Sequence, residues 1–359
     1  MILIAGPFPP PVHGASLMTE RVAQGLTARS IGFAVGNTSP NAAAGGIRYH
    51  LNRMRGYLGC CAQIARRARD GRPNALYLSL SGGLGLLYDL LLVACARLKR
   101  WDVIFHHHSF GYVNRPSRIL SLIVRVAGRE QRHVALCSAM AMGLQRVYGS
   151  SLQVQVVSTL VFMEMATPKE ASGRPLRTLG FISNISFEKG IDRFLDLLDA
   201  LKAAGSQVRG LVAGPFVDSR VQAYFERRAS ECGNVTYVGP VYGPEKDKFF
   251  SAIDLLVFPT RYENEAEPLV LFEAQGAGIM VAASRRGCIE PSPAMNGFSL
   301  ELDAVASNID GLVKPIVFWE NHPDEFRAVS RLAFENFQQT VTKSKSASEH
   351  FYRLFSEYR

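Results

Sequence analysis

The stretch from Asp254 to Glu290 constrains the fold of this chain more than any other part of it. The apolar run Leu255 to Phe258 predicts a buried parallel strand. A polar loop follows, and Pro268 suits the first turn of a helix that ends near Gly276. A second short apolar run, Ile279 to Ala282, predicts the next strand. We therefore expect a strand–loop–helix–strand unit whose loop opens onto a helix N-terminus.

Two carboxylates bracket the start of this helix: Glu265 lies in the loop and Glu273 lies within the helix. Unpaired backbone N–H groups and the helix dipole attract anions at this end. A phosphate can therefore bind the amides while the two acids accept hydrogen bonds from hydroxyls on either side. A nucleotide sugar has this order of groups, with sugar hydroxyls, a diphosphate and ribose hydroxyls. The simpler interpretation is a helix with solvated acids near its N-terminus.

The residues Glu265 to Gly276 (EAEPLVLFEAQG) and Gly287 to Glu290 (GCIE) resemble the E-x7-E signature of family-4 glycosyltransferases. The resemblance implies a GT-B fold, in which two Rossmann-like, doubly wound α/β domains face a central cleft. It also implies metal-independent sugar transfer with retention at the anomeric carbon. The first glutamate would face the donor sugar and Glu273 would hold the ribose. In the same way it assigns Ala266, Glu267 and Leu269 to the donor site. The family usually has Gly-Phe-Gly where this chain has Ala266-Glu267-Pro268, so either Glu267 points away from the phosphates or the resemblance fails at this position.

Positive charge is concentrated in the first half of the chain. Residues 1–165 hold 18 Lys and Arg against 6 Asp and Glu, whereas the remainder holds 22 against 25. This asymmetry predicts an acidic partner of the first half. Anionic lipid at a membrane surface, or a lipid-diphosphate acceptor, fits better than nucleic acid, because no basic motif interleaved with aromatic residues is present. The alternative is a soluble domain with an arginine-rich surface.

Much of this charge lies between residues 46 and 72, where interleaved apolar residues predict one or two amphipathic helices. Such helices lie on membranes or pack as core helices with a solvated basic face, and the sequence leaves both open.

The longest apolar run, Leu84 to Leu98, contains Asp89 and Arg97 and predicts a core helix, not a membrane span. The chain begins directly with a strand, and its six cysteines form no C-x-x-C pair, so we expect reduced thiols and a cytoplasmic protein, peripheral on the inner face of the membrane. The arginines between residues 46 and 72 are Arg48, Arg53, Arg55, Arg66, Arg67, Arg69 and Arg72.

Residues 1–6 predict a buried strand, and a proline-rich loop then leads through Gly14 to a helix from Ala15 to Ala28. The loop lacks the G-x-G-x-x-G pattern of a dinucleotide site. Gly14 lies where backbone amides can approach a phosphate closely, and the resemblance implies that this first loop faces the donor diphosphate. The alternative is a rigid surface loop.

A predicted strand, Asp102 to Phe105, leads into His106-His107-His108. Open α/β sheets bind ligands at the carboxyl ends of their strands. Alternate side chains face opposite ways, so His106 and His108 can share a face. Zinc binding needs further ligands at suitable spacing, and we find none, so we expect no metal. In the resembling family a histidine after this strand contacts the donor sugar, and we assign His108 to this role, with His106 as second choice.

A polar segment, residues 164–177, predicts the linker between the domains. We expect an acceptor-binding domain over 1–165, a nucleotide-sugar-binding domain over 166–340 and, by the resemblance, a helix over 341–359 that returns to the first domain. Lys189 at the start of a helix, Gly190 to Ala203, is a candidate diphosphate partner. The family pattern Gly-Arg…Lys-Gly is matched at Lys189-Gly190, but Ser183-Asn184 replaces Gly-Arg. Either Arg261 or Arg285 compensates for the missing arginine, or phosphate binding is weaker; Asn184 stays in the donor site as predicted.

Together with these residues, the resemblance implies a retaining glycosyltransferase that uses no cofactor. It would move a sugar from a UDP- or GDP-linked donor to a lipid-linked, polysaccharide or lipopolysaccharide acceptor. Lys189, Glu265 and His108 are the predicted catalytic residues, with Glu265 orienting the sugar for front-side attack. The alternatives are a nucleotide-sugar epimerase of the same fold and a catalytically silent nucleotide-sugar-binding subunit.

Overall fold

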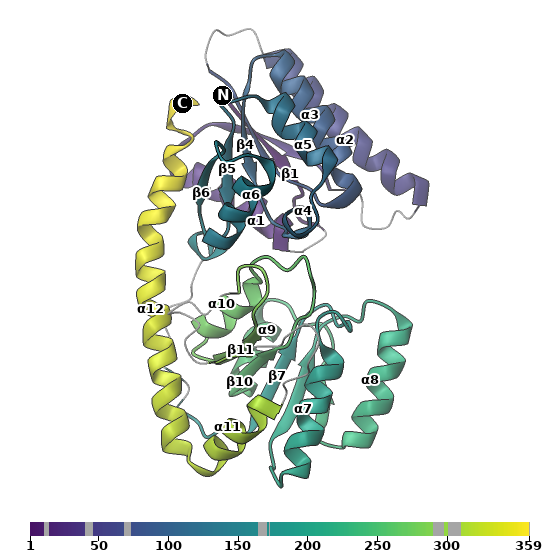
Figure 1. Cartoon of the computed structure of the whole chain (residues 1–359), viewed down its shortest axis with the longest axis vertical. Helices are drawn as coiled ribbons and strands as arrows, with labels where there is room; N and C mark the ends of the chain where they lie inside the picture. Colours follow the sequence, from purple (N-terminus) through teal and green to yellow (C-terminus); the bar gives the residue numbers. More distant parts are fainter. Residues whose placement is uncertain are drawn as a thin grey trace. The chain divides into compact units, whose positions relative to one another are not determined.

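The computed structural model describes residues 1–10, 14–39, 46–67, 73–163, 171, 173–289, 298–300 and 310–358. The chain divides into two compact units (Figure 1). Unit 1 comprises Met1–Met163 and Ser344–Arg359, and unit 2 comprises Glu164–Lys343. The sequence predicted boundaries at residues 165 and 340, so the observed division falls within a few residues of each.

Unit 1 is built on a six-stranded parallel sheet with the strand order β2-β1-β3-β4-β5-β6. The five residues of β1, ILIAG, are all buried, and β1 pairs in parallel with both β2 and β3. A run of aliphatic residues without alternation suits a strand that is covered on both faces. The strands are β1 (Ile2–Gly6), β2 (Phe33–Asn37), β3 (Ala75–Ser79), β4 (Asp102–His106), β5 (Arg132–Ala135) and β6 (Gln153–Val156).

The connections between these strands are helical, as parallel pairing requires. The switch in strand order lies beside β1, because β2 is on one side of it and β3 is on the other. The helices are α1 (Gly14–Ala28), α2 (Gly46–Arg67), α3 (Leu86–Leu98), α4 (Gly111–Asn114), α5 (Arg118–Ala127) and α6 (Ser138–Tyr148), with 3-10 turns η1 (Gly83–Gly85) and η2 (Thr159–Phe162).

The C-terminal segment belongs to the core of unit 1. Helix α12 (Pro323–Arg353) ends there and is followed by the 3-10 turn η4 (Ser356–Tyr358). Phe351 and Phe355 are fully buried, and their rings lie 6.5 and 5.9 Å from the ring of Tyr77 on β3. The Tyr358 hydroxyl donates a hydrogen bond to the Asp102 carboxylate at 2.9 Å. The last residues of the chain thus pack against strands formed from its first third.

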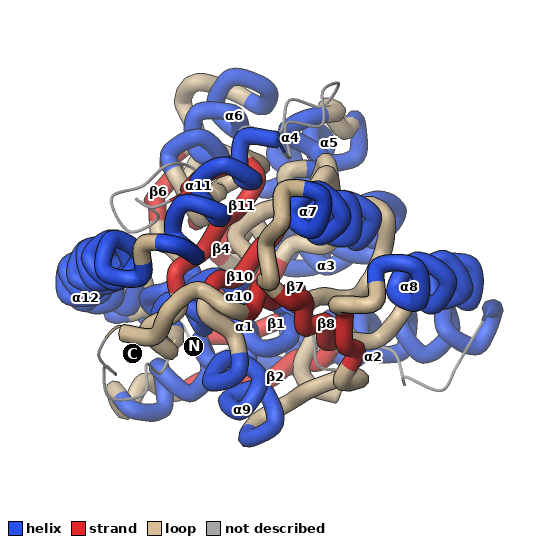
Figure 2. The backbone as a smooth tube through the Cα atoms, turned by 90° about the horizontal axis from the view of Figure 1, so that it is seen from below, coloured by secondary structure: helices blue, strands red, loops and turns tan. Residues whose placement is uncertain are grey.

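Unit 2 contains a second six-stranded parallel sheet, with the order β12-β11-β10-β7-β8-β9. One hydrophobic cluster packs α7, α8 and α11 against one face of this sheet, and another packs α9 and α10 against the other face (Figure 2). The predicted doubly wound arrangement is therefore confirmed for this unit. Its strands are β7 (Thr178–Ile182), β8 (Arg209–Ala213), β9 (Val235–Tyr237), β10 (Leu255–Phe258), β11 (Met280–Ser284) and β12 (Phe298–Leu300), and its helices are α7 (Ile191–Ala203), α8 (Ser219–Cys232), α9 (Pro244–Ala252), α10 (Leu269–Gly276) and α11 (Asp310–Asn321).

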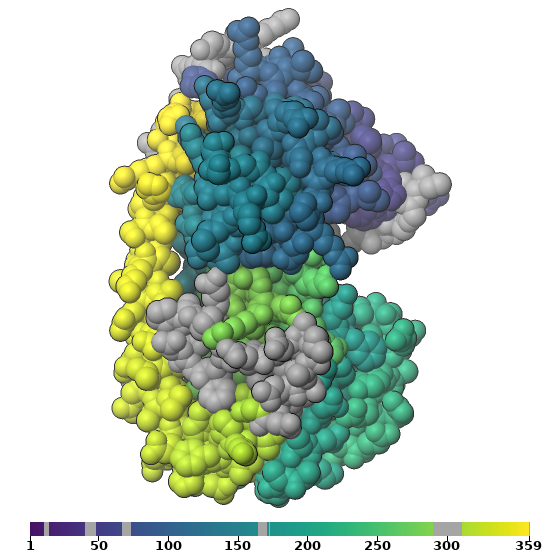
Figure 3. All heavy atoms as spheres, viewed as in Figure 1, coloured from purple at the N-terminus to yellow at the C-terminus, as the bar shows by residue number. Residues whose placement is uncertain are grey.

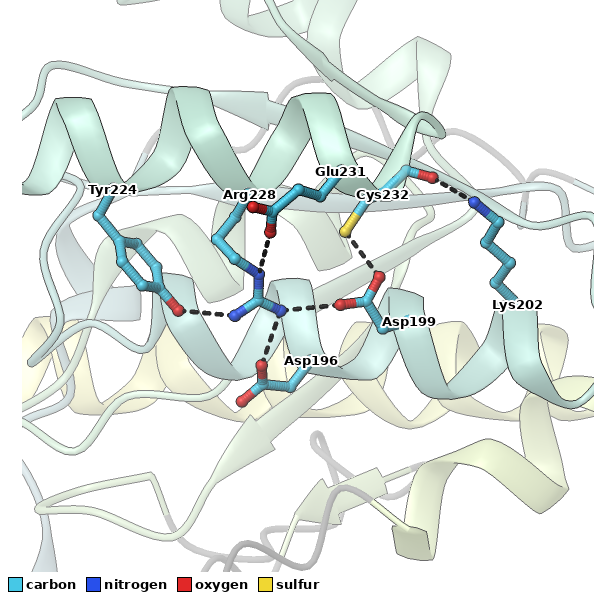
Figure 4. Close-up of polar contacts among 7 residues, drawn as sticks. All are labelled: Asp196, Asp199, Lys202, Tyr224, Arg228, Glu231 and Cys232. Atoms are coloured by element: carbon cyan, nitrogen blue, oxygen red, sulfur yellow. Dashed lines mark hydrogen bonds and ion pairs between the residues drawn. The ribbon is translucent and has the colours of Figure 1, made fainter.

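An ion-pair network joins α7 to α8 (Figure 4). The Arg228 guanidinium on α8 donates to Asp196 at 3.0 Å and to Asp199 at 2.8 Å, both on α7. It also donates to the Tyr224 hydroxyl at 2.9 Å, and Glu231 lies 3.8 Å away. These partners raise the pKa of Arg228 against the opposing effect of its partial burial. One arginine therefore neutralises carboxylates that would otherwise repel each other across two helices.

Three helices begin in different ways. Ser138 is the first residue of α6, and Cys137 holds the N-cap position without a side-chain hydrogen bond. α8 begins at Ser219, because the Asp218 carboxylate accepts a hydrogen bond from the Val221 N–H at 2.8 Å and caps the helix there. α12 begins at Pro323, much earlier than the helix predicted over 341–359, with a proline and two acids in its first turn.

Two further expectations concern the membrane and the cysteines. Within the described ranges, no helix combines the length and apolarity that a bilayer crossing requires. Free thiols are confirmed at Cys60, Cys61, Cys95 and Cys232, of which Cys60 and Cys232 are buried. Cys137 and Cys288 are not free thiols, so the expectation that all six cysteines are reduced is wrong for these two.

Candidate active site

The candidate site of unit 2 lies where the strand order of its sheet reverses. β7 and β10 are parallel neighbours; β8 and β9 continue the sheet on one side, and β11 and β12 on the other. Open α/β sheets bind ligands beyond the carboxyl ends of the strands at such a switch point. The loop after β7 carries Lys189, and the loop after β10 carries Glu265. The topology thus brings together two predicted residues that are far apart in the sequence.

Lys189 and Glu265 form an ion pair at this point. The Lys189 ammonium donates to Glu265 Oε2 at 2.6 Å, and the Thr260 hydroxyl donates to the same oxygen at 2.9 Å. Glu265 is only 7% exposed. The lysine nitrogen also lies 5.0 Å from the ring centroid of Tyr262 and 5.5 Å from that of Phe258, so aromatic faces help to hold the cation. The pair can present a positive charge beside a fixed carboxylate.

Gly190 allows the two loops to approach each other. It is the N-cap of α7 and has a φ of +85°, in the left-handed region that favours glycine. A Cβ atom at this position would lie 2.1 Å from the carbonyl oxygen of Pro259, in the loop after β10. The Lys189-Gly190 pair predicted from the sequence therefore has two parts: the lysine supplies charge and the glycine supplies space.

A third loop, after β11, supports the backbone of Glu265. The Cys288 N–H donates to the Ala266 carbonyl at 2.8 Å. Gly287 has a φ of +58°, and a Cβ atom there would lie only 1.9 Å from the Glu265 carbonyl oxygen. The Gly-x-x-Glu end of the sequence motif thus contacts the loop that carries the first glutamate. Glu290, the last residue of that motif, lies outside the described residues.

Helix α10 begins at Leu269, directly after the Glu265 loop, with Pro268 at its N-cap position and no side-chain cap. The sequence predicted Pro268 in the first turn, so the helix begins one residue later than predicted. Glu273 lies in the second turn of α10 and forms an ion pair with Lys246 of α9. The sequence did not single out Lys246, although its position at the start of a short helix before β10 was visible. Each of the two predicted glutamates therefore has its own lysine.

The sequence left open whether Arg261 or Arg285 replaces the arginine that the resembling family has at position 184. Asn184, which replaces it, is exposed in the loop after β7. The Arg261 guanidinium donates to Asp192 at 2.8 Å and to the Phe187 carbonyl, and the Arg261 N–H donates to the Glu188 carbonyl at 2.7 Å. Arg261 therefore ties the two loops together and its charge is balanced by Asp192. Ala266 is buried and Glu267 is half-buried beside it.

The consecutive histidines His106, His107 and His108 lie on two faces, as predicted. The rings of His106 and His108 are 4.2 Å apart between centroids, whereas the ring of His107 stacks on His133 with a centroid distance of 5.2 Å. His106 is fully buried and hydrogen-bonded to the Tyr77 hydroxyl, and burial holds its pKa well below the usual range. His108 is half-buried and so more accessible than His106. Its contact with a donor sugar stays a prediction.

His107 instead belongs to a buried chain of hydrogen bonds with Tyr112 and His133. Its Nδ1 lies 3.0 Å from the Tyr112 hydroxyl, and its Nε2 lies 2.9 Å from Nδ1 of His133. Burial lowers the pKa of His107 well below the usual range and that of His133 to about 4. Both imidazoles are therefore neutral near pH 7 and serve the core of unit 1.

Gly14 is the first residue of α1 and is exposed. A Cβ atom at this position would meet nothing within 4 Å, so packing inside the described part of the chain does not require glycine there. A cavity of about 480 Å³ in unit 1 contains none of the predicted site residues. Its lining includes Arg132, Gln153, His350 and Arg353. In the described ranges no group of three His, Cys, Asp or Glu residues is placed to hold a metal ion.

Comparisons with known proteins can be set against this geometry. A sequence model of the family described as "Glycosyl transferases group 1" matches residues 166–314, and a search of curated protein sequences returns no match. Among solved structures, the chain is similar to HepE from Anabaena in complex with UDP-glucose, with 17% identity over 98% of both chains and a TM-score of 0.66. It is also similar to sucrose-phosphate synthase from Thermosynechococcus elongatus, with 15% identity over 99% of both chains and a TM-score of 0.66. A third similar structure is WaaG, a glycosyltransferase involved in lipopolysaccharide biosynthesis, with 14% identity over 97% of this chain and 98% of that one and a TM-score of 0.59. The chain therefore has a GT-B fold, and its second unit carries the sequence match to the group 1 glycosyl transferases.

Proposed function

We propose that this protein is a glycosyltransferase that takes a sugar from a nucleotide diphosphate donor. The observation that carries the proposal is the meeting of Lys189 and Glu265, 2.6 Å apart, at the switch point of the unit 2 sheet. This point lies within the residues that match the glycosyl transferase family model. A cation beside a buried carboxylate, at the start of a helix, suits a diphosphate joined to a hydroxylated sugar.

The donor groups would be divided among the residues as follows. Lys189 and the backbone amides at the start of α10 would bind the leaving diphosphate, whose negative charge grows as the glycosidic bond breaks. Glu265 would accept hydrogen bonds from the sugar hydroxyls, and Glu273 would hold the ribose. His108 of unit 1 would contact the transferred sugar. Uridine is the first base to test, because HepE is described in complex with UDP-glucose.

We propose transfer with retention of configuration and without a metal ion. The bond between the anomeric carbon and the diphosphate oxygen breaks, and an acceptor hydroxyl oxygen bonds to the same face of that carbon. The acceptor proton passes to the departing phosphate oxygen, so the products are a glycoside and a nucleotide diphosphate. The acceptor would be a lipid-linked saccharide or a surface polysaccharide intermediate, a class consistent with the positive charge of residues 1–165 and with the role stated for WaaG.

Calorimetric titration with a panel of UDP- and GDP-sugars tests donor binding. Lys189→Met should weaken binding of the preferred donor by about tenfold to a hundredfold, because a charge-assisted hydrogen bond contributes roughly 1.5–3 kcal/mol. Lys248→Met is the matched control: this lysine is exposed on α9 of the same unit, and its loss should leave the affinity nearly unchanged. Equal affinities of the two variants would contradict the assignment of Lys189.

Turnover separates transfer from the other activities that this fold supports. Release of nucleotide diphosphate that requires an acceptor supports a transferase. Interconversion of donor sugars without an acceptor would support an epimerase, and binding without turnover would support a silent subunit. Glu265→Gln should reduce turnover strongly; full turnover by this variant on a defined donor and acceptor would remove Glu265 from the mechanism.

A further inference from the structure

Three helices of unit 1 lie side by side and share an orientation. α2 contacts α3, and α3 contacts α5, as Figure 1 also shows. Each helix buries one side: Tyr57 and Ile64 on α2, Val93 on α3 and Ile123 on α5 are all at most 1% exposed. The opposite sides of the helices form one continuous outer layer, which we name the α2–α3–α5 face.

The α2–α3–α5 face carries a concentration of exposed aliphatic side chains. Leu51, Met54 and Leu58 recur at helical spacing on α2, and the two leucines are 55% and 52% exposed. Leu84 on η1 and Leu87 on α3 are 75% and 52% exposed. Single exposed apolar residues are ordinary on protein surfaces, but a group on adjacent helices marks an interaction site. In the space-filling view, the purple and blue segments that include α2 and α5 reach the surface of unit 1 (Figure 3).

The charge on this face has one sign. Asp89 is the sole Asp or Glu in the sequences of α2, α3 and α5, and its side chain is fully buried. Arg48, Arg55 and Arg66 of α2 are exposed, and Arg118 and Arg125 of α5 are exposed on either side of Leu122. The face therefore combines aliphatic side chains with arginines and presents no carboxylate of its own helices.

The buried Asp89 fixes this arrangement. The Tyr57 hydroxyl of α2 donates to its carboxylate at 2.6 Å, and the Ser81 N–H donates at 2.8 Å. The Arg53 guanidinium of α2 donates to the Ser81 hydroxyl at 2.9 Å and lies 5.1 Å from the ring centroid of Tyr88 on α3. These contacts join α2 to the start of α3, so the exposed leucines of the two helices belong to one rigid surface.

We propose that the α2–α3–α5 face docks on a membrane surface that contains anionic lipid. The leucines would enter the boundary between headgroups and acyl chains, and the arginines would pair with lipid phosphates. A second copy of the chain fits this face less well, because arginines would meet arginines across a two-fold interface. Single-stranded nucleic acid fits less well, because the large exposed apolar side chains of this face are aliphatic, and the rings of His50 and Tyr88 are hydrogen-bonded to each other at 3.0 Å. The proposal does not depend on the proposed reaction, since it concerns binding of the full chain to lipid.

Sedimentation of the full chain with vesicles tests the proposal. We expect binding to vesicles of phosphatidylcholine mixed with phosphatidylglycerol, weaker binding as salt is added, and little binding to phosphatidylcholine alone. Each of Arg48→Gln and Arg55→Gln should reduce partitioning by about fivefold, which corresponds to ~1 kcal/mol for one arginine near an anionic surface. The double variant Leu84→Asp, Leu87→Asp should reduce it by about tenfold or more, because the apolar contribution is lost.

Leu332→Asp is the matched control for the leucine variant. Leu332 is 56% exposed, but it lies on α12 in unit 2. The Leu332→Asp variant should bind vesicles like the wild type, and circular dichroism should show that all variants are folded. The arginine variants change only exposed side chains, so they still test the proposal if the leucine variant unfolds. Equal sedimentation of all variants with anionic vesicles would overturn the proposal. So would a wild-type dimer in solution that the Leu84→Asp, Leu87→Asp change dissociates. Because no donor or acceptor is added, these outcomes are separate from failure of the proposed transferase activity.

Discussion

The Gly287→Ala substitution tests whether the loop after β11 positions the candidate active site. Gly287 has a φ of +58°, and a Cβ atom there would lie 1.9 Å from the Glu265 carbonyl oxygen, 2.8 Å from the Glu265 carbonyl carbon and 3.0 Å from the Ala266 carbonyl oxygen. These neighbours are backbone atoms and cannot turn away as a flexible side chain would. The substitution must therefore move either its own loop or the loop that carries Glu265.

The expected effect has two parts. An alanine in the left-handed region costs roughly 1–2 kcal/mol wherever it occurs. Contacts of Cβ atoms below 3.0 Å are essentially never seen, so the two backbones must also separate by about 1 Å. A displacement of about 1 Å at a reacting centre can reduce the rate by about a hundredfold. We therefore expect both a loss of stability and a large loss of turnover.

Gly233→Ala separates the two parts. Gly233 follows α8 with a φ of +73°, and a Cβ atom there would meet nothing within 4 Å. This control should lose only the stability that an alanine in the left-handed region costs, and its turnover should stay at the wild-type value. The assay is acceptor-dependent release of nucleotide diphosphate, with the Tm of each variant measured in parallel. A Gly287→Ala variant with wild-type turnover, and with a fall in Tm no larger than that of Gly233→Ala, would refute the reasoning.

Three further outcomes are expected. Burial raises the pKa of Asp89 to about 6, so its ionised form destabilises the folded state, and the free energy of unfolding should fall as pH rises through about 6. Asparagine does not ionise, so the free energy of unfolding of Asp89→Asn relative to the wild type, measured with urea, should increase by on the order of 2–3 kcal/mol between about pH 4 and about pH 7. A pH-independent difference would contradict this. Arg228→Met should lower the free energy of unfolding by about 1–2 kcal/mol, because it leaves Asp196 and Asp199 unneutralised, while Arg227→Met on the same helix should cost less than about 0.5 kcal/mol; equal losses would show that the network contributes nothing. Glu273→Gln should raise the donor KM by about tenfold with a smaller change in kcat, as loss of a ribose hydrogen bond requires, and an unchanged KM would remove Glu273 from the donor site.

The sequence predicted the architecture well because each strand can be recognised from its own short run of apolar residues. Runs such as Leu255 to Phe258 are apolar without alternation, and the helices between them carry an apolar stripe, so a parallel sheet with crossover helices is the natural outcome. The start of α10 was predicted to within one residue, because proline at position 268 marks the beginning of a helix. The start of α12 was predicted too late, at residue 341, although a proline and two acids mark its first turn at Pro323.

The contacts within the candidate site could not be predicted in the same way. Lys189 and Glu265 were both named from motifs, but their contact depends on β7 and β10 being neighbours, and strand order is set by the packing of the whole sheet. Thr260 and Lys246 were missed, because a single polar residue near a strand or helix carries no pattern of its own. The burial of His106 was missed for a similar reason: it depends on Phe351, which arrives from the other end of the chain.

The position of Phe351 and Phe355 has a consequence for the order in which the protein can be made. During synthesis the first 163 residues leave the ribosome long before residues 344–359 exist. Until then the rings that cover Tyr77 are missing, and Asp102 lacks its hydrogen bond from Tyr358. The nascent amino-terminal half therefore has an exposed apolar surface, which is covered only after residues 344–359 have been made. A nonsense codon before residue 344 would thus damage the unit that residues 1–163 begin.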